Sequence, residues 1–267
     1  MKKIKFMLGL IALSSVQLMA DNLVVNGSFE QVQLSGVPVG WEAKGNTAEG
    51  LKVAEKAVTV KGVNGEAGIL VQYGVPLATN KKYLVSYKAR GKDGDFRVYL
   101  EWGIAKSTQA FGAQWRKGGS DWKTINGIFL LPSEAEKPYI VIAVKGENPV
   151  TFQDISISDV QSGNLFNADF SILDAGDMAV GWEIKGKSEQ FKFSPNLVGL
   201  NVSDNDAWLI NALEKQIPGA KYNISFDVKG DATCDYRVYY EWVQIEPSGS
   251  ATSGSGFTKC PAQWTTV

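Results

Sequence analysis

Short stretches in which apolar and polar residues alternate recur along this chain, with Gly, Asn, Asp and Pro between them. In residues 83–89, Tyr, Val, Tyr and Ala alternate with Leu, Ser and Lys. Residues 139–145 are apolar more continuously, which is typical of an inner strand of a sandwich. Successive side chains of a β-strand point to opposite faces, so these patterns indicate many short strands. We predict an all-β fold of antiparallel β-sandwiches of the jelly-roll kind.

The alternation is clearest in residues 96–102. One face of this strand would carry only apolar side chains, those of Phe96, Val98, Leu100 and Trp102. The other face would carry Arg97, Tyr99 and Glu101. The apolar row must face the core, so the Arg-Tyr-Glu row faces solvent or a shallow groove. Lys88 and Arg90 would share that outer side if their strand is a neighbour of 96–102.

The sequence repeats itself once, at an offset of about 141 residues. Residues 40–45 return at 181–186, and 96–102 return at 236–242, so the second Arg-Tyr-Glu row is Arg237, Tyr239 and Glu241. This regularity predicts two homologous domains, 22–162 and 164–267, joined by a short polar link at 161–163. Four tryptophans recur beside strand patterns, and we interpret them as core residues: Trp41, Trp122, Trp182 and Trp264.

The second domain is predicted to be incomplete. Residues 264–267 align with 122–125, whereas the first domain continues to about residue 160. A domain that stops inside a strand exposes a core edge. We therefore expect a fragment, or a longer gene product with a catalytic or anchoring domain past Val267. The alternative is a naturally shorter domain.

Residues 1–20 have the order of an export signal. Lys2, Lys3 and Lys5 precede an apolar run at 6–13, and small and polar residues lead to Ala20. The run is too short to span about 30 Å of hydrocarbon, and no later stretch is long enough. We predict a signal peptide, a secreted or periplasmic protein and no membrane span. A buried N-terminal helix is the alternative.

Charge and composition remove several classes of function. The 267-residue chain has a formal net charge of −1, and loss of the three signal lysines leaves 24 basic against 28 acidic groups, a net of −4. This balance gives no electrostatic drive toward nucleic acid. The chain contains no histidine, which excludes Ser-His-Asp and Cys-His machinery and most catalytic zinc sites.

An aromatic side chain between arginine and glutamate on an open sheet face suits a sugar. The C–H face of a sugar ring packs on an aromatic ring, and Arg and Glu can hydrogen-bond to its hydroxyls. The candidate ligand-binding residues are therefore those of both rows, Arg97, Tyr99, Glu101, Arg237, Tyr239 and Glu241. The alternative is a weak cross-strand salt bridge with tyrosine as filler.

Trp115 is a further candidate ligand-binding residue. It lies in the long segment 103–121 between two strand patterns, and loops carry binding residues disproportionately. The equivalent segment 247–256 is rich in Ser and Gly and has no tryptophan. If Trp115 binds ligand, the two domains should differ in affinity. The alternative is that Trp115 closes the end of the sandwich.

Cys234 and Cys260 precede strand patterns on either side of a long excursion. Two strands joined in this way can run antiparallel and bring the cysteines together. Export to an oxidising compartment then favours a disulfide, which would add about 3–4 kcal/mol. Two separate buried thiols are the alternative.

Three motifs together carry a family resemblance: Asn22–Glu30 (NLVVNGSFE), Gly40-Trp41, and Phe152–Ile157 (FQDISI). This frame resembles the carbohydrate-binding modules of families four and nine, which are galactose-binding-like jelly rolls. The resemblance covers the first domain and about three quarters of the second. It implies binding of a polysaccharide or oligosaccharide such as a β-glucan or xylan, and frequent attachment to a secreted glycoside hydrolase.

The resemblance also implies a structural Ca²⁺ ion, which relatives often carry where the first and last strands meet. The matching carboxylates are Glu30 and Asp154. Carboxylate oxygens, together with backbone carbonyls, suit Ca²⁺. Ser171 replaces Glu30 in the second domain, so a site there is not expected. The alternative is two unconnected surface acids.

Three functions compete, and glycan binding without catalysis is our prediction. A structural or adhesive surface protein with sandwich spacers is the alternative, and it would bury both Tyr99 and Trp115. A binder would expose one of them in a groove. A glycoside hydrolase or lyase needs two carboxylates about 5–10 Å apart. Glu101 and Glu241 belong to different domains, so we expect no enzyme in this segment.

Overall fold

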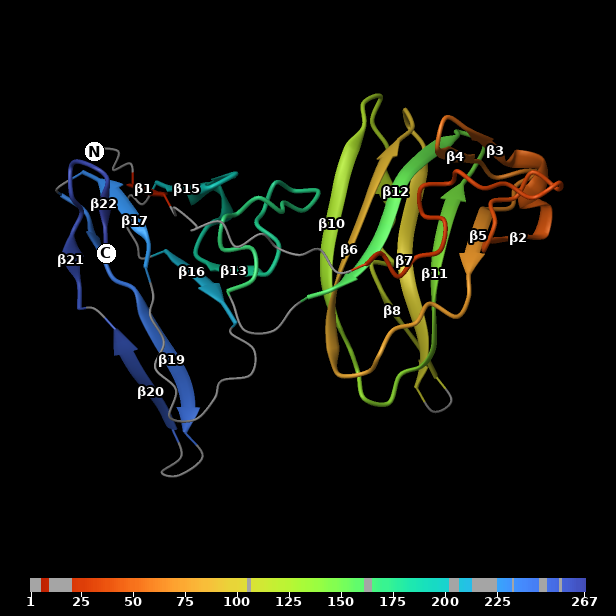
Figure 1. Cartoon of the computed structure of the whole chain (residues 1–267). Helices are drawn as coiled ribbons and strands as arrows, with labels where there is room; N and C mark the ends of the chain where they lie inside the picture. Colours follow the sequence, from red (N-terminus) through yellow and green to blue (C-terminus); the bar gives the residue numbers. More distant parts are fainter. Residues whose placement is uncertain are drawn as a thin grey trace. The chain divides into compact units, whose positions relative to one another are not determined.

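The computed structural model describes residues 6–9, 21–104, 107–160, 165–201, 207–212, 225–231, 233–244, 249–254 and 256–267 (Figure 1). The chain forms two compact units. The first unit comprises residues 17–162 and 174–176, and the second comprises 1–16, 163–173 and 177–267. The predicted link at 161–163 lies outside the described residues.

The first unit is a jelly-roll sandwich of two antiparallel sheets. One sheet has the order β10 (Lys123–Leu131), β6 (Lys81–Arg90), β12 (Val150–Asp159), β4 (Ala57–Val60) and β3 (Lys52–Ala54). The other has the order β2 (Glu42–Lys44), β5 (Gly68–Gln72), β11 (Glu136–Lys145), β7 (Asp95–Ile104) and β8 (Ser107–Phe111), with β9 (Arg116–Lys117) also paired to β7. One 3₁₀ helix, Gly45–Gly50, follows β2.

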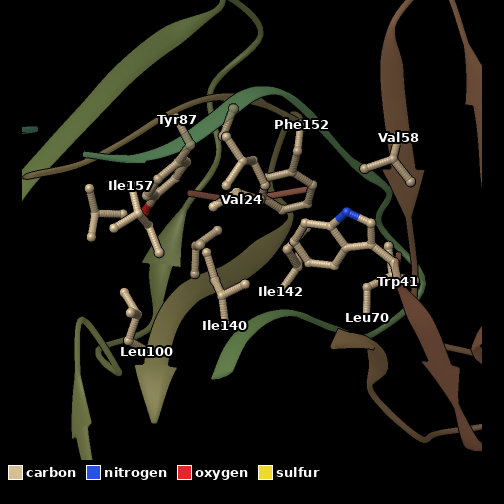
Figure 2. Packing of buried hydrophobic residues seen from close by; sticks show 14 of the residues in the cluster. Val24, Trp41, Val58, Leu70, Tyr87, Leu100, Ile140, Ile142, Phe152 and Ile157 are labelled. Carbon is tan, nitrogen blue, oxygen red and sulfur yellow. The ribbon is translucent and has the colours of Figure 1, made fainter. Parts of the chain in front are cut away.

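Alternate residues of both sheets form the core of the first unit. Figure 2 shows Ile140 and Ile142 of β11 packed among side chains of the opposite sheet, such as Phe152 and Val58. All four are fully buried. The alternation of 96–102 is confirmed, since its apolar row is buried: Phe96, Val98, Leu100 and Trp102. Period-two patterning thus decides which face of β7 points inward.

The sequence Asn26–Phe29 has a structural role. Asn26 and Phe29 adopt left-handed φ angles of 49° and 55°. The Asn26 amide donates to the carbonyls of Gln31, at 2.7 Å, and Val39, at 3.1 Å. Gly27 packs so closely on β12 that an added Cβ would lie 2.0 Å from the Ile155 carbonyl oxygen. The motif therefore fixes the entry loop against β12.

The second unit repeats this loop and the order of several strand pairings. Asn167 donates to the carbonyls of Ile172 and Val180 at 2.8 and 2.9 Å, as Asn26 does at the equivalent positions. One sheet has the order β14 (Phe191–Ser194), β15 (Leu197–Leu200), β1 (Phe6–Gly9), β17 (Asp227–Gly230) and β22 (Thr265–Thr266). A 3₁₀ helix, Ser188–Gln190, precedes β14.

Among its described residues, the second unit also has three two-stranded pairs. They are β13 (Trp182–Lys185) with β16 (Trp208–Asn211), β18 (Asp235–Tyr236) with β21 (Thr258–Lys259), and β19 (Tyr239–Gln244) with β20 (Gly249–Gly254). Its buried cluster is small: Phe170, Ala179, Phe191, Phe193 and Val198. The side chain of Trp242, expected on the core face, lies outside the described residues.

Lys88 and Arg90 were expected on the face of Arg97 only if their strand were a neighbour of β7. It is not a neighbour, because β6 and β7 belong to different sheets. The strand order depends on pairing between distant segments, which alternation within a strand does not specify. Trp264 is not a core residue, since 45% of it is exposed, whereas Trp41 is buried.

The N-terminal segment has one described strand, β1, which pairs with β15 and β17. The rest of residues 1–20 lies outside the described part of the chain. The export signal therefore stays a prediction. Within the described residues, no helix has the length and apolar character needed to cross a membrane.

Candidate functional site

The outer face of the sheet that contains β7 carries the predicted row. Because β7 pairs with β11, Tyr139 lies opposite Glu101 and Val141 lies opposite Tyr99. The same pairing places Ala143 opposite Arg97. Val141 and Ala143 are shorter than the β7 side chains opposite them, so Tyr99 and Arg97 form more of the surface. Arg97, Tyr99 and Glu101 are each half-buried.

The Arg97 guanidinium lies between two aromatic rings. Its central carbon is 4.6 Å from the ring centre of Tyr99 and 4.6 Å from that of Trp115. Trp115 reaches it because β9 pairs with the start of β7, which brings the preceding residue alongside. Arg97 also donates from Nη1 to the Ala113 carbonyl at 3.3 Å. Its buried Nε has no acceptor among the described residues.

A second aromatic group extends this surface across β11 to β5. The rings of Tyr73 and Tyr139 are 5.2 Å apart, and Lys44 lies 5.0 Å above the Tyr73 ring. Lys44 pairs with Glu42 at 2.6 Å. The Tyr139 hydroxyl donates to Glu101, which links this group to the predicted row. We call the whole set the aromatic face: Lys44, Tyr73, Arg97, Tyr99, Glu101, Trp115 and Tyr139.

Sequence reasoning missed Tyr73 and Tyr139. Tyr139 is the first residue of the predicted apolar segment 139–145 and lies within β11, and Tyr73 directly follows β5, a short strand that was not predicted from the sequence. Two tyrosines at the ends of strand patterns were the available signal. Tyr73 and Tyr139 reach the same face as Tyr99 because β5 and β11 lie in the same sheet as β7. The alternation within each strand does not show which distant strands pair.

The surroundings of Tyr99, Tyr139 and Lys44 raise the pKa of each group. Burial raises the pKa of Tyr99, although the neighbouring Arg97 opposes the shift. Burial, and then the hydrogen bond to Glu101, raise the pKa of Tyr139. Hydrogen bonds to Glu42 and then Tyr73 raise the pKa of Lys44. At neutral pH Tyr99 and Tyr139 are therefore neutral hydroxyls and Lys44 is a cation.

The exposed aromatic surface is unevenly distributed. Tyr73 is 53% exposed and Trp115 is 43% exposed. Arg97 covers one side of the Trp115 ring, and the other rings of the face are half-buried. Tyr73 and Trp115 are therefore the two platforms on which a flat apolar ligand surface can stack.

Comparison with known families identifies the type of domain. Residues 21–150 match the carbohydrate binding domain family of types 4 and 9. The first repeat is a carbohydrate-binding module of this family. The match includes every residue of the aromatic face and all strands of the sandwich except β12, which it reaches only at Val150.

Solved structures similar to this chain include other carbohydrate-binding modules. A CBM4 structure is 17% identical, covers 51% of this chain and 99% of its own, and has a TM-score of 0.42. The CBM22-1 xylan-binding domain from Paenibacillus barcinonensis Xyn10C is 13% identical over 54% and 98%, with a TM-score of 0.43. TmCBM61, solved with β-1,4-galactotriose, is 18% identical over 53% and 100%, with a TM-score of 0.40. A search of curated proteins gave no match.

The second repeat has the same arginine stack as the carbohydrate-binding module. Arg237 lies 4.4 Å from the ring centre of Tyr239 and 5.0 Å from that of Phe257. Phe257 takes the place of Trp115 and is 64% exposed. The segment 247–256 has no tryptophan, as noted, but Phe257 follows it directly and was missed. Glu241 lies two residues after Tyr239 on β19 and is exposed.

Glu30 and Asp154 of the module each pair with a lysine. Lys56 lies 2.6 Å from Glu30, and Lys88 lies 2.9 Å from Asp154. A hollow of about 370 Å³ lies beside Glu30, away from the aromatic face, and is lined by Phe29, Val32 and residues 53–56. Among the described residues, no group of three or more acidic, Cys or His side chains gathers. A Ca²⁺ ion would have to displace both lysines and take further oxygens from the backbone, and its presence stays a proposal.

Cys234 and Cys260 lie side by side, and both are buried thiols in the structure. The Cys260 amide donates to the Cys234 carbonyl at 3.0 Å, next to the pairing of β18 with β21. Burial and then the neighbouring Cys234 raise the pKa of Cys260 to about 12. The expected proximity is present, and the disulfide itself stays a prediction.

Proposed function

We propose that the chain is a non-catalytic polysaccharide-binding protein whose first repeat binds through the aromatic face. The observation that carries the proposal is the arginine held between two aromatic rings, Arg97 in the first repeat and Arg237 in the second. Two rings fix the guanidinium in place before a ligand arrives, so less side-chain entropy is lost on binding.

The aromatic face can supply both components of sugar recognition. Trp115 and Tyr73 offer exposed rings for the C–H faces of sugar units. Arg97 can donate to ligand hydroxyls, and the Glu101 carboxylate can accept from them. The exposure of Trp115 favours binding over the spacer alternative, which expects this residue to be buried.

The cellular setting belongs to the same proposal. An export signal at 1–20 would place the protein outside the cytoplasm, secreted or periplasmic, where polysaccharides are found. A catalytic domain in a longer product, such as a glycoside hydrolase, would then be held near its substrate by these modules. The intact mass of the protein recovered from the native source would show both processing at Asp21 and any further sequence.

Affinity electrophoresis of the whole chain tests the binding function. The protein is run in native gels that contain β-glucans, xylans, mannans or galactans, beside a gel without polysaccharide. We expect at least one polysaccharide to retard the protein, because each repeat presents an arginine stack with an exposed ring. No retardation by any of them, with the protein shown to be folded by circular dichroism, would contradict the proposal.

Calcium binding is tested separately from sugar binding. If Glu30 and Asp154 hold Ca²⁺, millimolar Ca²⁺ will raise the unfolding temperature of the first repeat and excess EDTA will lower it. Glu30→Gln removes a charged ligand and should abolish the difference. Equal unfolding temperatures in Ca²⁺ and EDTA would leave the two lysine pairs as the partners of these carboxylates.

A further inference from the structure

Arg97 carries a positive charge that no acid in contact with it neutralises. Its two rings are neutral, and the Ala113 carbonyl to which it donates is neutral as well. Among the described residues, no carboxylate forms an ion pair with Arg97. The residues of the first unit outside the description, 17–20, 105–106 and 161–162, include no Asp or Glu. The guanidinium is therefore a cation without a counter-charge from its own unit.

The two acids that share β7 with Arg97 both have other partners. Because side chains alternate along a strand, Asp95 and Glu101 lie on the same face as Arg97. Asp95 pairs with Lys117 at 3.3 Å, and Glu101 accepts a hydrogen bond from the Tyr139 hydroxyl. Glu101 is also about 13 Å further along the strand at about 3.3 Å per residue, which exceeds the Debye length of about 8 Å at physiological salt. Neither acid therefore cancels the charge of Arg97.

The second repeat has the same arrangement of charges. Asp235 lies opposite Lys259 in the pairing of β18 with β21, as Asp95 lies opposite Lys117 in the pairing of β7 with β9. Asp235 and Lys259 form an ion pair at 3.0 Å. Among the described residues, Arg237 also stacks on two rings without an ion pair to a carboxylate. In both repeats, therefore, a lysine neutralises the nearest acid and the stacked arginine is left over.

The two rings also restrict how a ligand can reach the guanidinium. With rings on two sides, the N–H groups at its edge are the donors that remain for a ligand. A carboxylate accepts two parallel N–H bonds from such an edge and supplies the opposite charge. A sugar hydroxyl brings no charge, so the cation would stay unbalanced when the ligand covers it. The stack therefore suits an anionic ligand better than a neutral one.

We propose that the aromatic face prefers polysaccharides that contain uronic acids, with a carboxylate of the ligand paired to Arg97. The C–H face of the sugar stacks on Trp115. Neutral hydroxyls lie toward Glu101, because this carboxylate repels a second one. Arg237 binds a further uronic acid in the same way. The inference rests on the proposed polysaccharide-binding function of this face and names the class of ligand.

Affinity electrophoresis with matched polymers tests this preference. The whole chain is run at one fixed ionic strength in gels that contain polygalacturonate, alginate or glucuronoxylan, each beside the same polymer with its carboxylates reduced to alcohols. We expect at least one acidic polymer to bind at least tenfold more tightly than its reduced form. Equal binding of both forms would overturn the inference and leave the proposed function intact. Retardation by neither form of any polymer, nor by the neutral polysaccharides, would contradict the proposed function as well.

Two variants of equal net charge show whether the stacks cause the preference. The first carries Arg97→Gln and Arg237→Gln, and the control carries Arg90→Gln and Lys229→Gln, which remove two cations outside the stacks. With folding checked by circular dichroism, we expect the first variant to bind acidic and reduced polymers equally and the control to keep the tenfold preference. An equal loss in both variants would overturn the inference, because general charge attraction would then explain the preference. A preference for a sulfated galactan over its desulfated form, without one for carboxylates, would also overturn it.

Discussion

At the scale of single residues, a cation over an aromatic ring does not by itself mark the site. Arg90 lies 4.6 Å from the ring centre of Trp122, the same distance that separates Arg97 from each of its rings. That contact lies on the other sheet and has one ring. The Arg97 stack differs because two rings enclose the guanidinium and one of them, Trp115, is substantially exposed.

Tyr73 should contribute a stacking surface to ligand binding. Tyr73→Ala removes the most exposed ring of the aromatic face, and we expect about tenfold weaker binding, or roughly 1.4 kcal/mol, by isothermal titration with the polysaccharide that retards the protein. Tyr73→Phe is the matched control, since it keeps the ring and removes only the hydroxyl beside Lys44. Equal losses in both variants would assign the effect to the hydroxyl and contradict stacking.

At the scale of elements, the two faces of a strand could be predicted from the sequence, whereas the pairing between strands could not. The faces of β7 could be assigned from residues 96–102 because side chains alternate with a period of two. The placement of β6 in the opposite sheet, and of β5 and β11 beside β7, depends on contacts between segments far apart in sequence. Three of the seven residues of the aromatic face, Lys44, Tyr73 and Tyr139, therefore could not be assigned in advance.

Tyr87 makes the sandwich sensitive to alkaline pH. Burial in the core raises the pKa of this β6 residue to about 12, against about 10 in an unfolded chain, although Arg116 opposes the shift. The folded state favours the neutral hydroxyl of Tyr87. The free energy of unfolding is therefore unaffected by its ionisation below pH 10 and falls as the pH rises toward 12. The difference corresponds to about 2–3 kcal/mol.

Chemical denaturation at a series of pH values checks this account. The free energy of unfolding of the first repeat should fall between pH 10 and 12, and Tyr87→Phe should remove about 2–3 kcal/mol of that fall. Because Phe keeps the ring, packing in the core is preserved. A variant whose pH dependence matches that of the unmodified protein would contradict the assignment to Tyr87.

The cysteine pair should stabilise the second unit once it is oxidised. The predicted disulfide would add about 3–4 kcal/mol, so the reductant dithiothreitol should lower the unfolding temperature of oxidised protein by several degrees. Cys260→Ala should unfold at the reduced temperature with or without reductant. Two free thiols, measured by alkylation and mass spectrometry after air oxidation, would rule the bridge out.

At the scale of the whole molecule, the repeat organises both structure and function. Asn26 and Asn167 fix equivalent loops, and Arg97 and Arg237 form equivalent stacks. The sequence repeat predicted both Arg-Tyr-Glu rows, because a single offset aligns them. It did not predict that Phe257 replaces Trp115, because that residue lies in a long connection where the alignment has few matching residues. The two repeats therefore share one arrangement of rings around an arginine, with Phe257 in place of Trp115, and we expect them to bind ligand in the same way.

The measurement that tests this account most directly is native electrophoresis of two matched double variants in the polysaccharide that retards the unmodified chain. The first carries Trp115→Ala and Phe257→Ala, which remove the exposed ring from each arginine stack. The second carries Trp122→Ala and Trp264→Ala, which remove repeat-related tryptophans outside the stacks. We expect the first variant to migrate as it does without polysaccharide and the second to remain retarded. Binding through the arginine stacks would be contradicted if the first variant were still retarded. It would also be contradicted if the second variant, shown to be folded, lost retardation while the first kept it.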